Sequence, residues 1–248
     1  MLNKIKDKRL VVANCFEIEI DRILIFVETI SEIEAFRELN FYHFEFTYRN
    51  LEQGTISNIF FLGNMALELI RIENPALAIK YSTQTNMDII ARTQWRRNQA
   101  LPFGFVLRYV ASQQPRSRRR CGNADGQKIN SIQAYSQINF SSKNLQELQE
   151  PACYIVSKSL TCENLLDNAS AIKQRLLAHQ SKTSKLTNVQ ITLNTFKPLT
   201  KTVSLIYTLD LIDIKQGNYP QLKLEFDQGC RQQLFLATFS TIPMIISY

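Results

Sequence analysis

The residues best suited to bind a charged partner lie in one basic stretch near the middle of the chain. Residues 92–128 hold nine basic side chains against a single acid, Asp125, which gives a local net charge of nine minus one, or +8. The whole chain of 248 residues carries only +7, so the other residues together sum to −1. Charge concentrated in this way is typical of proteins that bind a polyanion. The basic residues are Arg92, Arg96, Arg97, Arg108, Arg116, Arg118, Arg119, Arg120 and Lys128.

The arginine run from Arg116 to Arg120 is flanked by Pro115 and Gly122, which predicts an exposed loop. Guanidinium groups bind phosphate in a bidentate manner, and such contacts supply affinity with little discrimination between nucleotide sequences. We therefore expect this run to contact nucleic acid. Two other interpretations stay open: the run meets an acidic protein surface, or it is a solvated loop without a partner.

Trp95 is the only tryptophan, and Arg96 and Arg97 follow it directly. An aromatic ring beside cations can stack on an unpaired base while the cations contact phosphates, as in proteins that bind single strands. The alternative is a tryptophan in the core beneath a helix. The expected nucleic-acid interface therefore consists of Trp95 and the nine basic residues of the stretch.

Catalytic and metal-binding patterns are sparse in this sequence. His43, between Tyr42 and Phe44, could act as a general base that activates a ribose hydroxyl for metal-independent RNA cleavage, although a structural histidine in an aromatic strand is the favoured interpretation. Five scattered cysteines and two histidines match no zinc spacing, so we expect no metal. The sequence contains neither a G-x-G-x-x-G nor a P-loop pattern, and we expect no cofactor.

The cysteine count and the hydropathy indicate the compartment. Five cysteines are an odd number and none lies in a C-x-x-C pair, which favours reduced thiols and a cytoplasmic protein. Asn14 and Glu17 interrupt the apolar run near the N-terminus, so we predict no secretory signal. No window approaches eighteen unbroken apolar residues, and we expect no membrane partner.

The first half of the chain reads mainly as strands. Phe16, Ile18 and Ile20 alternate with polar residues, which is the period of a half-buried strand. Ser31 and Glu34 have the spacing of a capping box and predict the start of a helix. The expected strands or extended segments are 10–27, 41–48, 56–62, 65–72, 76–81 and 103–111. The expected helices are 31–39 and 86–95.

The second half begins after a polar, aperiodic stretch. Thr161 is the expected cap of a helix whose apolar face is Leu165, Ala169, Ile172 and Leu176. We predict a hairpin between residues 189–193 and 203–214, with the turn at 197–200. The other expected elements are strands at 153–156, 222–226 and 242–248 and a helix at 228–239.

These elements predict an α+β fold of mainly antiparallel strands with few helices, arranged as two ferredoxin-like βαββαβ halves. The expected organisation is an N-terminal half over 1–112, a basic connecting loop over 113–149 and a C-terminal half over 150–248. The element order is similar to that of RNA-recognition motifs and of repeat-associated proteins in CRISPR complexes. The chain carries no RNP1-type run, and the order alone assigns no family.

The function that we expect is a non-enzymatic nucleic-acid-binding subunit, with RNA or single strands favoured, inside a larger complex with other protein subunits. Two alternatives from other classes stay open. One is a metal-independent endoribonuclease that uses His43. The other is a structural assembly protein of viral or plasmid origin whose basic loop meets an acidic neighbour.

Overall fold

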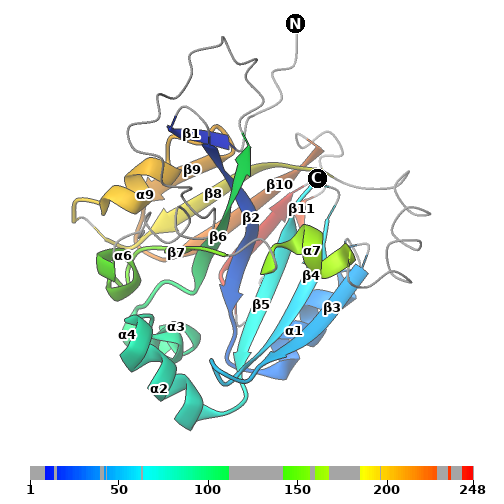
Figure 1. Ribbon diagram of the computed structural model, residues 1–248, viewed down its shortest axis with the longest axis vertical. Coiled ribbons are helices and arrows are strands. Elements are labelled where there is room, and N and C mark those ends of the chain that lie inside the picture. Colours follow the sequence, from blue (N-terminus) through cyan, green and yellow to red (C-terminus); the bar gives the residue numbers. More distant parts are fainter. Residues whose placement is uncertain are drawn as a thin grey trace, which may run out of the picture.

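The strands of the protein form two mixed sheets, and short helices lie around them (Figure 1). The structure is a computed structural model, and no helix in the described part of the chain is long and apolar enough to cross a membrane. It describes residues 9–13, 16–39, 42, 44–62, 64–111, 142–156, 160–167, 185–195, 197–227, 234–235 and 242–247.

The first sheet is centred on β2 and has the strand order β3-β4-β5-β2-β6-β7, with β1 also paired to β2. β2 runs parallel to β5, and β6 runs parallel to β7, whereas the other neighbours are antiparallel. Its strands are β1 (Arg9–Ala13), β2 (Phe16–Phe26), β3 (Phe44–Asn50), β4 (Thr55–Phe61), β5 (Ala66–Ile72), β6 (Phe103–Ala111) and β7 (Ala152–Ile155).

The second sheet has the order β11-β12-β10-β8-β9. The predicted hairpin is wrong, because Lys201–Ile206 forms the helix α9 and the following strand returns parallel to β8. Parallel neighbours need such a crossover, whereas a hairpin joins antiparallel strands. The predicted helix at 228–239 is also wrong at β11, which pairs with β12. The strands are β8 (Leu186–Leu193), β9 (Ile212–Gln216), β10 (Gln221–Phe226), β11 (Leu234–Phe235) and β12 (Met244–Ser247).

Capping groups explain where α1 (Ile30–Glu38) and α2 (Pro75–Thr85) begin. Asn74 accepts hydrogen bonds from the first amides of α2, and Pro75 fills its first turn, so the extended segment expected at 76–81 is in fact helical. α1 begins after Thr29, whose backbone amide donates a hydrogen bond to the Glu32 carboxylate at 2.8 Å. The N-cap therefore lies two residues before Ser31, where it was expected. The other helices of the described residues, besides α9, are α3 (Ile89–Thr93), α4 (Trp95–Asn98), α6 (Ser142–Gln146) and α7 (Cys162–Asp167).

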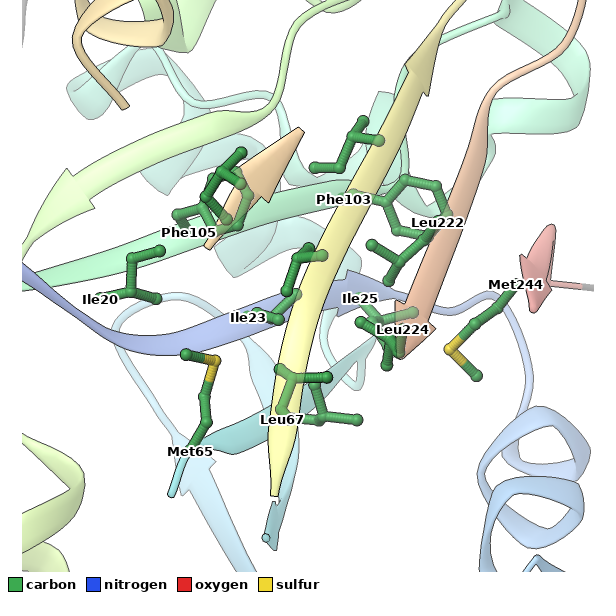
Figure 2. Packing of buried hydrophobic residues seen from close by; sticks show 14 of the residues in the cluster. Ile20, Ile23, Ile25, Met65, Leu67, Phe103, Phe105, Leu222, Leu224 and Met244 are labelled. Carbon is green, nitrogen blue, oxygen red and sulfur yellow. The ribbon is translucent and has the colours of Figure 1, made fainter. Parts of the chain in front are cut away.

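The main core lies between the two sheets (Figure 2). Ile23 and Ile25 on β2 belong to the same buried cluster as Leu222 and Leu224 on β10 and Met244 on β12. These side chains come from strands of both sheets, so alternate residues of each strand bury one face against the other sheet. On its opposite face, the first sheet is covered in part by α3 and α7, each over a smaller apolar cluster.

The α+β class predicted from sequence is confirmed, but both sheets are mixed, and the two ferredoxin-like halves are not confirmed. The division of the chain into 1–112, 113–149 and 150–248 stays a prediction. One pairing bears on it: β7, in the expected C-terminal half, adds to the first sheet beside β6 through a parallel register from Gly104 with Ala152 to Leu107 with Ile155.

Gly54 is required by the turn between β3 and β4. Its φ is +67°, and a Cβ atom there would overlap the carbonyl oxygen of Asn74 and lie 2.8 Å from Leu77 Cβ. We expect Gly54→Ala to lower the free energy of unfolding by about 1–3 kcal/mol through backbone strain and this overlap. Urea unfolding of both proteins measures the difference, and an alanine variant as stable as the wild type would contradict the expectation.

Candidate functional site

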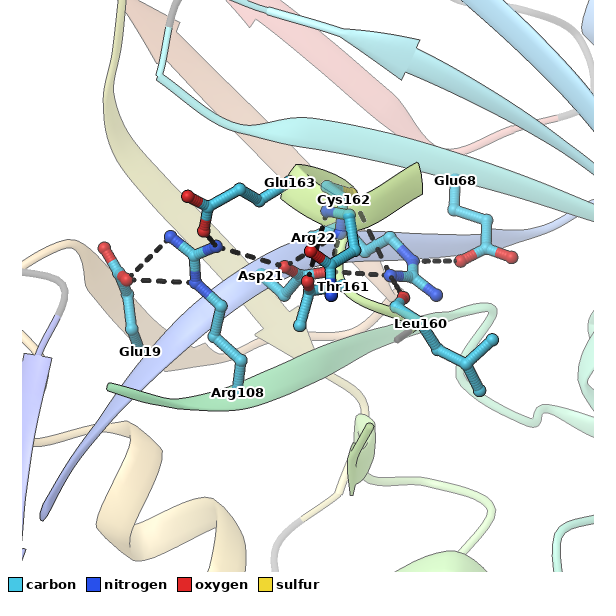
Figure 3. Close-up of polar contacts among 10 residues, drawn as sticks. Glu19, Asp21, Arg22, Glu68, Arg108, Leu160, Thr161, Cys162 and Glu163 are labelled. Atoms are coloured by element: carbon cyan, nitrogen blue, oxygen red, sulfur yellow. Dashed lines mark hydrogen bonds and ion pairs between the residues drawn. The ribbon is translucent and has the colours of Figure 1, made fainter. Parts of the chain in front are cut away.

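The most unusual feature of the first sheet is a set of buried charges centred on a bulge in β2. The register between β2 and β6 pairs Ile20 with Leu107 and then Arg22 with Val106, so Asp21 is one extra residue. A bulge of this kind re-aims side chains. Here Asp21 and Arg22 both contact the segment that begins α7, on the face of the first sheet away from the second sheet (Figure 3).

Arg22 is the cation at the centre of this cluster and is only 4% exposed. Its Nε donates to the Glu68 carboxylate on β5, and its Nη1 donates to Asp21 Oδ2 at 2.6 Å and to the Leu160 carbonyl at 3.0 Å. Burial alone lowers the pKa of Arg22, but the neighbouring Glu68 and Asp21 outweigh it and raise the pKa well above its ordinary value. The guanidinium is therefore permanently charged.

A second arginine extends the cluster toward α7. Arg108 on β6 contacts Glu19 Oε2 on β2 through Nη2 at 2.9 Å, and its Nη1 donates to Glu163 Oε2 at 3.2 Å. The backbone amide of Cys162 lies 3.1 Å from both carboxylate oxygens of Asp21 (Figure 3). Burial opposes the charge on Arg108, yet its carboxylate neighbours raise its pKa. The two arginines and their acids thus join β2, β5, β6 and α7.

The chemistry open to this cluster follows from its burial. Burial raises the pKa of the Cys162 thiol, so it is protonated at neutral pH and is not an activated nucleophile. Burial likewise raises the pKa of Tyr154, which keeps its hydroxyl neutral. Within the described residues, no group of three or more His, Cys, Asp or Glu is placed to hold a metal ion. In this conformation the cluster fastens elements together.

Arg92, predicted at the nucleic-acid interface, lies instead in the interior with no exposed surface. Its guanidinium donates to three backbone carbonyls, those of Leu101 at 3.0 Å, Glu147 at 3.1 Å and Glu150 at 2.9 Å. Burial lowers the pKa of Arg92 to about 10, which still leaves it protonated at neutral pH. The structure corrects the expectation for this residue, because a side chain so enclosed does not reach a phosphate.

Arg96 and Arg97 lie on α4 and pair with acids at the start of α1. Arg96 contacts Glu32 at 2.8 Å, and its guanidinium carbon lies 4.9 Å from the centroid of the half-buried Trp95 ring. Arg97 contacts Glu28 at 3.0 Å and keeps 69% of its side chain exposed. The structure therefore brings Trp95, Arg96 and Arg97 together, whereas Arg108 takes part in the separate cluster around β2.

The other predicted site residues lie outside the described residues, and their roles stay predictions. They are His43, Arg116, Arg118, Arg119, Arg120 and Lys128.

Sequence reasoning missed the buried cluster, although a signal was present. Asp21 and Arg22 stand side by side in β2 just before the apolar run from Ile23 to Phe26, and Glu68 lies between the apolar Leu67 and Leu69 of β5. Charged residues at such positions have to be paired if the strand is buried.

Comparisons with known proteins give a fold likeness. No protein-family model matches the chain, and no curated protein sequence matches it. Among solved structures, the chain is similar to a crystal structure of a hypothetical protein from Staphylococcus aureus, with a TM-score of 0.53 and 11% sequence identity. The match covers 93% of this chain and 98% of the other. At this identity the likeness concerns the arrangement of helices and strands alone.

Proposed function

We propose that this protein is a non-enzymatic nucleic-acid-binding subunit, with RNA or single strands as the favoured ligand, and that the residues between 116 and 128 supply the main contacts. The observation that carries the proposal is the distribution of charge among the nine basic residues of the central stretch. Some of these cations are already paired with acids or carbonyls inside the fold. The other basic residues, between 116 and 128, have a single acidic residue, Asp125, near them in the sequence.

The arginines of the central stretch that the structure describes already have partners within the protein. Arg92 is enclosed among carbonyls, Arg96 and Arg97 are paired with Glu28 and Glu32, and Arg108 is paired with Glu19. Paired cations attract a polyanion less, since a neighbouring acid cancels much of their field.

The other basic residues of the central stretch lie between residues 116 and 128. This segment has four arginines and one lysine against Asp125, a net charge of five minus one, or +4. Arginines spaced this closely favour phosphate over isolated carboxylates, because the phosphate backbone presents charges at regular short intervals. The exposed Arg97 and the half-buried Trp95 are a second, weaker surface for the same ligand.

The salt dependence of binding tests the proposal. We expect the quadruple variant R116A/R118A/R119A/R120A to flatten the slope of log K against log salt concentration by roughly 2.5 to 4 units, since each lost phosphate contact removes about 0.7–0.9 of a released counterion. Fluorescence anisotropy with a labelled oligonucleotide at several salt concentrations measures the slope, on single-stranded RNA and on duplex DNA.

The matched control is R96A/R97A, which removes two arginines that already have acidic partners. We expect this variant to change the slope by less than about one unit. If the quadruple variant keeps the wild-type slope, residues 116–120 do not contact the nucleic acid. If the control flattens the slope as much, the surface on α4 is the main site instead.

A further inference from the structure

We propose that residues 160–167, which comprise Leu160, Thr161 and α7, form a strap that lifts from the first sheet on its own and exposes the buried charges beneath it to solvent. The strap lies on the face of the first sheet opposite the second sheet, above β2 and β5 (Figure 3). It carries no basic residue, so this proposal does not depend on nucleic-acid binding.

Polar contacts at one end hold the strap to the sheet. The Cys162 amide donates to the Asp21 carboxylate at 3.1 Å, and the Leu160 carbonyl accepts from Arg22 Nη1 at 3.0 Å. Among the side chains, Arg22 Nη1 lies 3.9 Å from Cys162 Sγ, and Glu163, whose side chain is 73% exposed, contacts Arg108 at 3.2 Å. Exposed pairs of this kind contribute little to stability, so Asp21 and Arg22 form the latch.

Among the described side chains of the strap, two pack against the apolar residues of the first sheet. Cys162 is buried and Leu165 partly buried against Ile59, Phe61 and Ala66, whereas Leu160 is 48% exposed. A helix of six residues is not stable without such contacts, because its first turn orders several residues for one hydrogen bond. The strap therefore depends on its latch more than on its own helix.

Hydration of the buried charges beneath the strap offsets part of the cost of its release. Glu19, Asp21, Arg22 and Glu68 are each between 3% and 5% exposed. Taking ions out of water costs several kcal/mol per ion, which their mutual attraction offsets only in part. When the strap lifts, these four side chains regain hydration while Arg22 and Glu68 keep each other as partners. Local opening is therefore less costly than unfolding the whole sheet.

The two described free cysteines allow a direct test. Cys162 lies in the strap, and Cys153 lies on β7 within the first sheet; both are buried, and burial raises the pKa of both thiols. We expect N-ethylmaleimide to label Cys162 in the native full-length protein at least about tenfold faster than Cys153, with rates read by peptide mass spectrometry. Equal rates would mean that Cys162 opens only on global unfolding, and they would overturn the proposal.

Asp21→Asn identifies the latch. This change keeps the shape of the side chain but removes the charge that the Cys162 amide and Arg22 contact. We expect labelling of Cys162 to rise about tenfold and that of Cys153 to stay unchanged, because charge-assisted hydrogen bonds are the strong ones. The control is Glu45→Gln, a change on the edge strand β3 that removes the ion pair of Glu45 with Arg37 on α1. We expect this control to leave the labelling rates of Cys162 and Cys153 unchanged.

The outcomes of the Asp21→Asn experiment separate the local and global explanations. Faster labelling of Cys162 alone supports the strap. An unchanged Cys162 rate would reject Asp21 as the latch and with it the proposal. A parallel rise at Cys162 and Cys153 would show that the strap opens only with the rest of the sheet, which also contradicts it.

Discussion

Arg92→Met is expected to lower the free energy of unfolding by about 3–4 kcal/mol, since three carbonyls, two of them in buried contacts, each lose a hydrogen bond worth about 1–1.5 kcal/mol. The guanidinium joins α3 to the nearby Leu101 carbonyl and to the carbonyls of Glu147 and Glu150, which are more than fifty residues away in sequence. Methionine fills much of the same volume but donates no hydrogen bond. Urea unfolding followed by circular dichroism measures the change.

Arg97→Met is the matched control for this experiment. Arg97 belongs to the same basic stretch, but 69% of its side chain is exposed, and it pairs with Glu28 at the surface. We expect a change of less than about 0.5 kcal/mol. If Arg92→Met were as mild as the control, the buried hydrogen bonds of Arg92 would not stabilise the fold. A loss of nucleic-acid binding without a loss of stability would return Arg92 to the interface.

Most strand positions could be predicted from sequence, because runs of β-branched and aromatic residues favour strands. The strand expected at 103–111 coincides with β6, the one expected at 56–62 is shifted by one residue from β4, and the one expected at 65–72 begins one residue before β5. Such runs say nothing about which strand lies beside which. The parallel neighbours β2 and β5, and the position of β7 beside β6, depend on contacts across the chain.

Two helices were read as extended for a local reason. In α9, Val203 and Ile206 are β-branched and favour strands, yet together with Thr202 they bury one side of a helix. In α2, alternating alanines imitate a strand, although Asn74 and Pro75 form a good helix start. In α2 the helical start signal is therefore present in the sequence, but the residue types that follow it favour a strand.

The candidate site shows where charge counting fails. A cluster of arginines in sequence predicts a high local potential only if those arginines are exposed and unpaired. Arg92 is buried and Arg108 is paired with Glu19, and neither property is visible in the sequence around them. The acids that pair with Arg96 and Arg97 come from a segment more than sixty residues away, so they do not enter a local count.

Arg22→Met is expected to destabilise the protein by about 3–5 kcal/mol, because it leaves buried acids without their cation. The Glu68 carboxylate, on a residue only 3% exposed, loses the Nε donor, and Asp21 loses the contact of 2.6 Å. An isolated carboxylate in such a place is costly unless it takes up a proton. Denaturant unfolding at neutral pH measures the loss.

The double variant Arg22→Met/Glu68→Met distinguishes two contributions to the free energy of unfolding: the net stabilisation by the ion pair, and the destabilisation caused by leaving one of its charges unpaired. Both side chains lie beneath the strap, and methionine has a volume close to that of each, so the double change replaces an ion pair by apolar packing. We expect the double variant to recover at least about 2 kcal/mol relative to Arg22→Met alone. The single variant Glu68→Met completes the comparison. If the losses of stability of the two single variants add up to that of the double variant, Glu68 does not become an unpaired buried charge when Arg22 is lost. The ion pair would then not be what holds β2 and β5 together on this face.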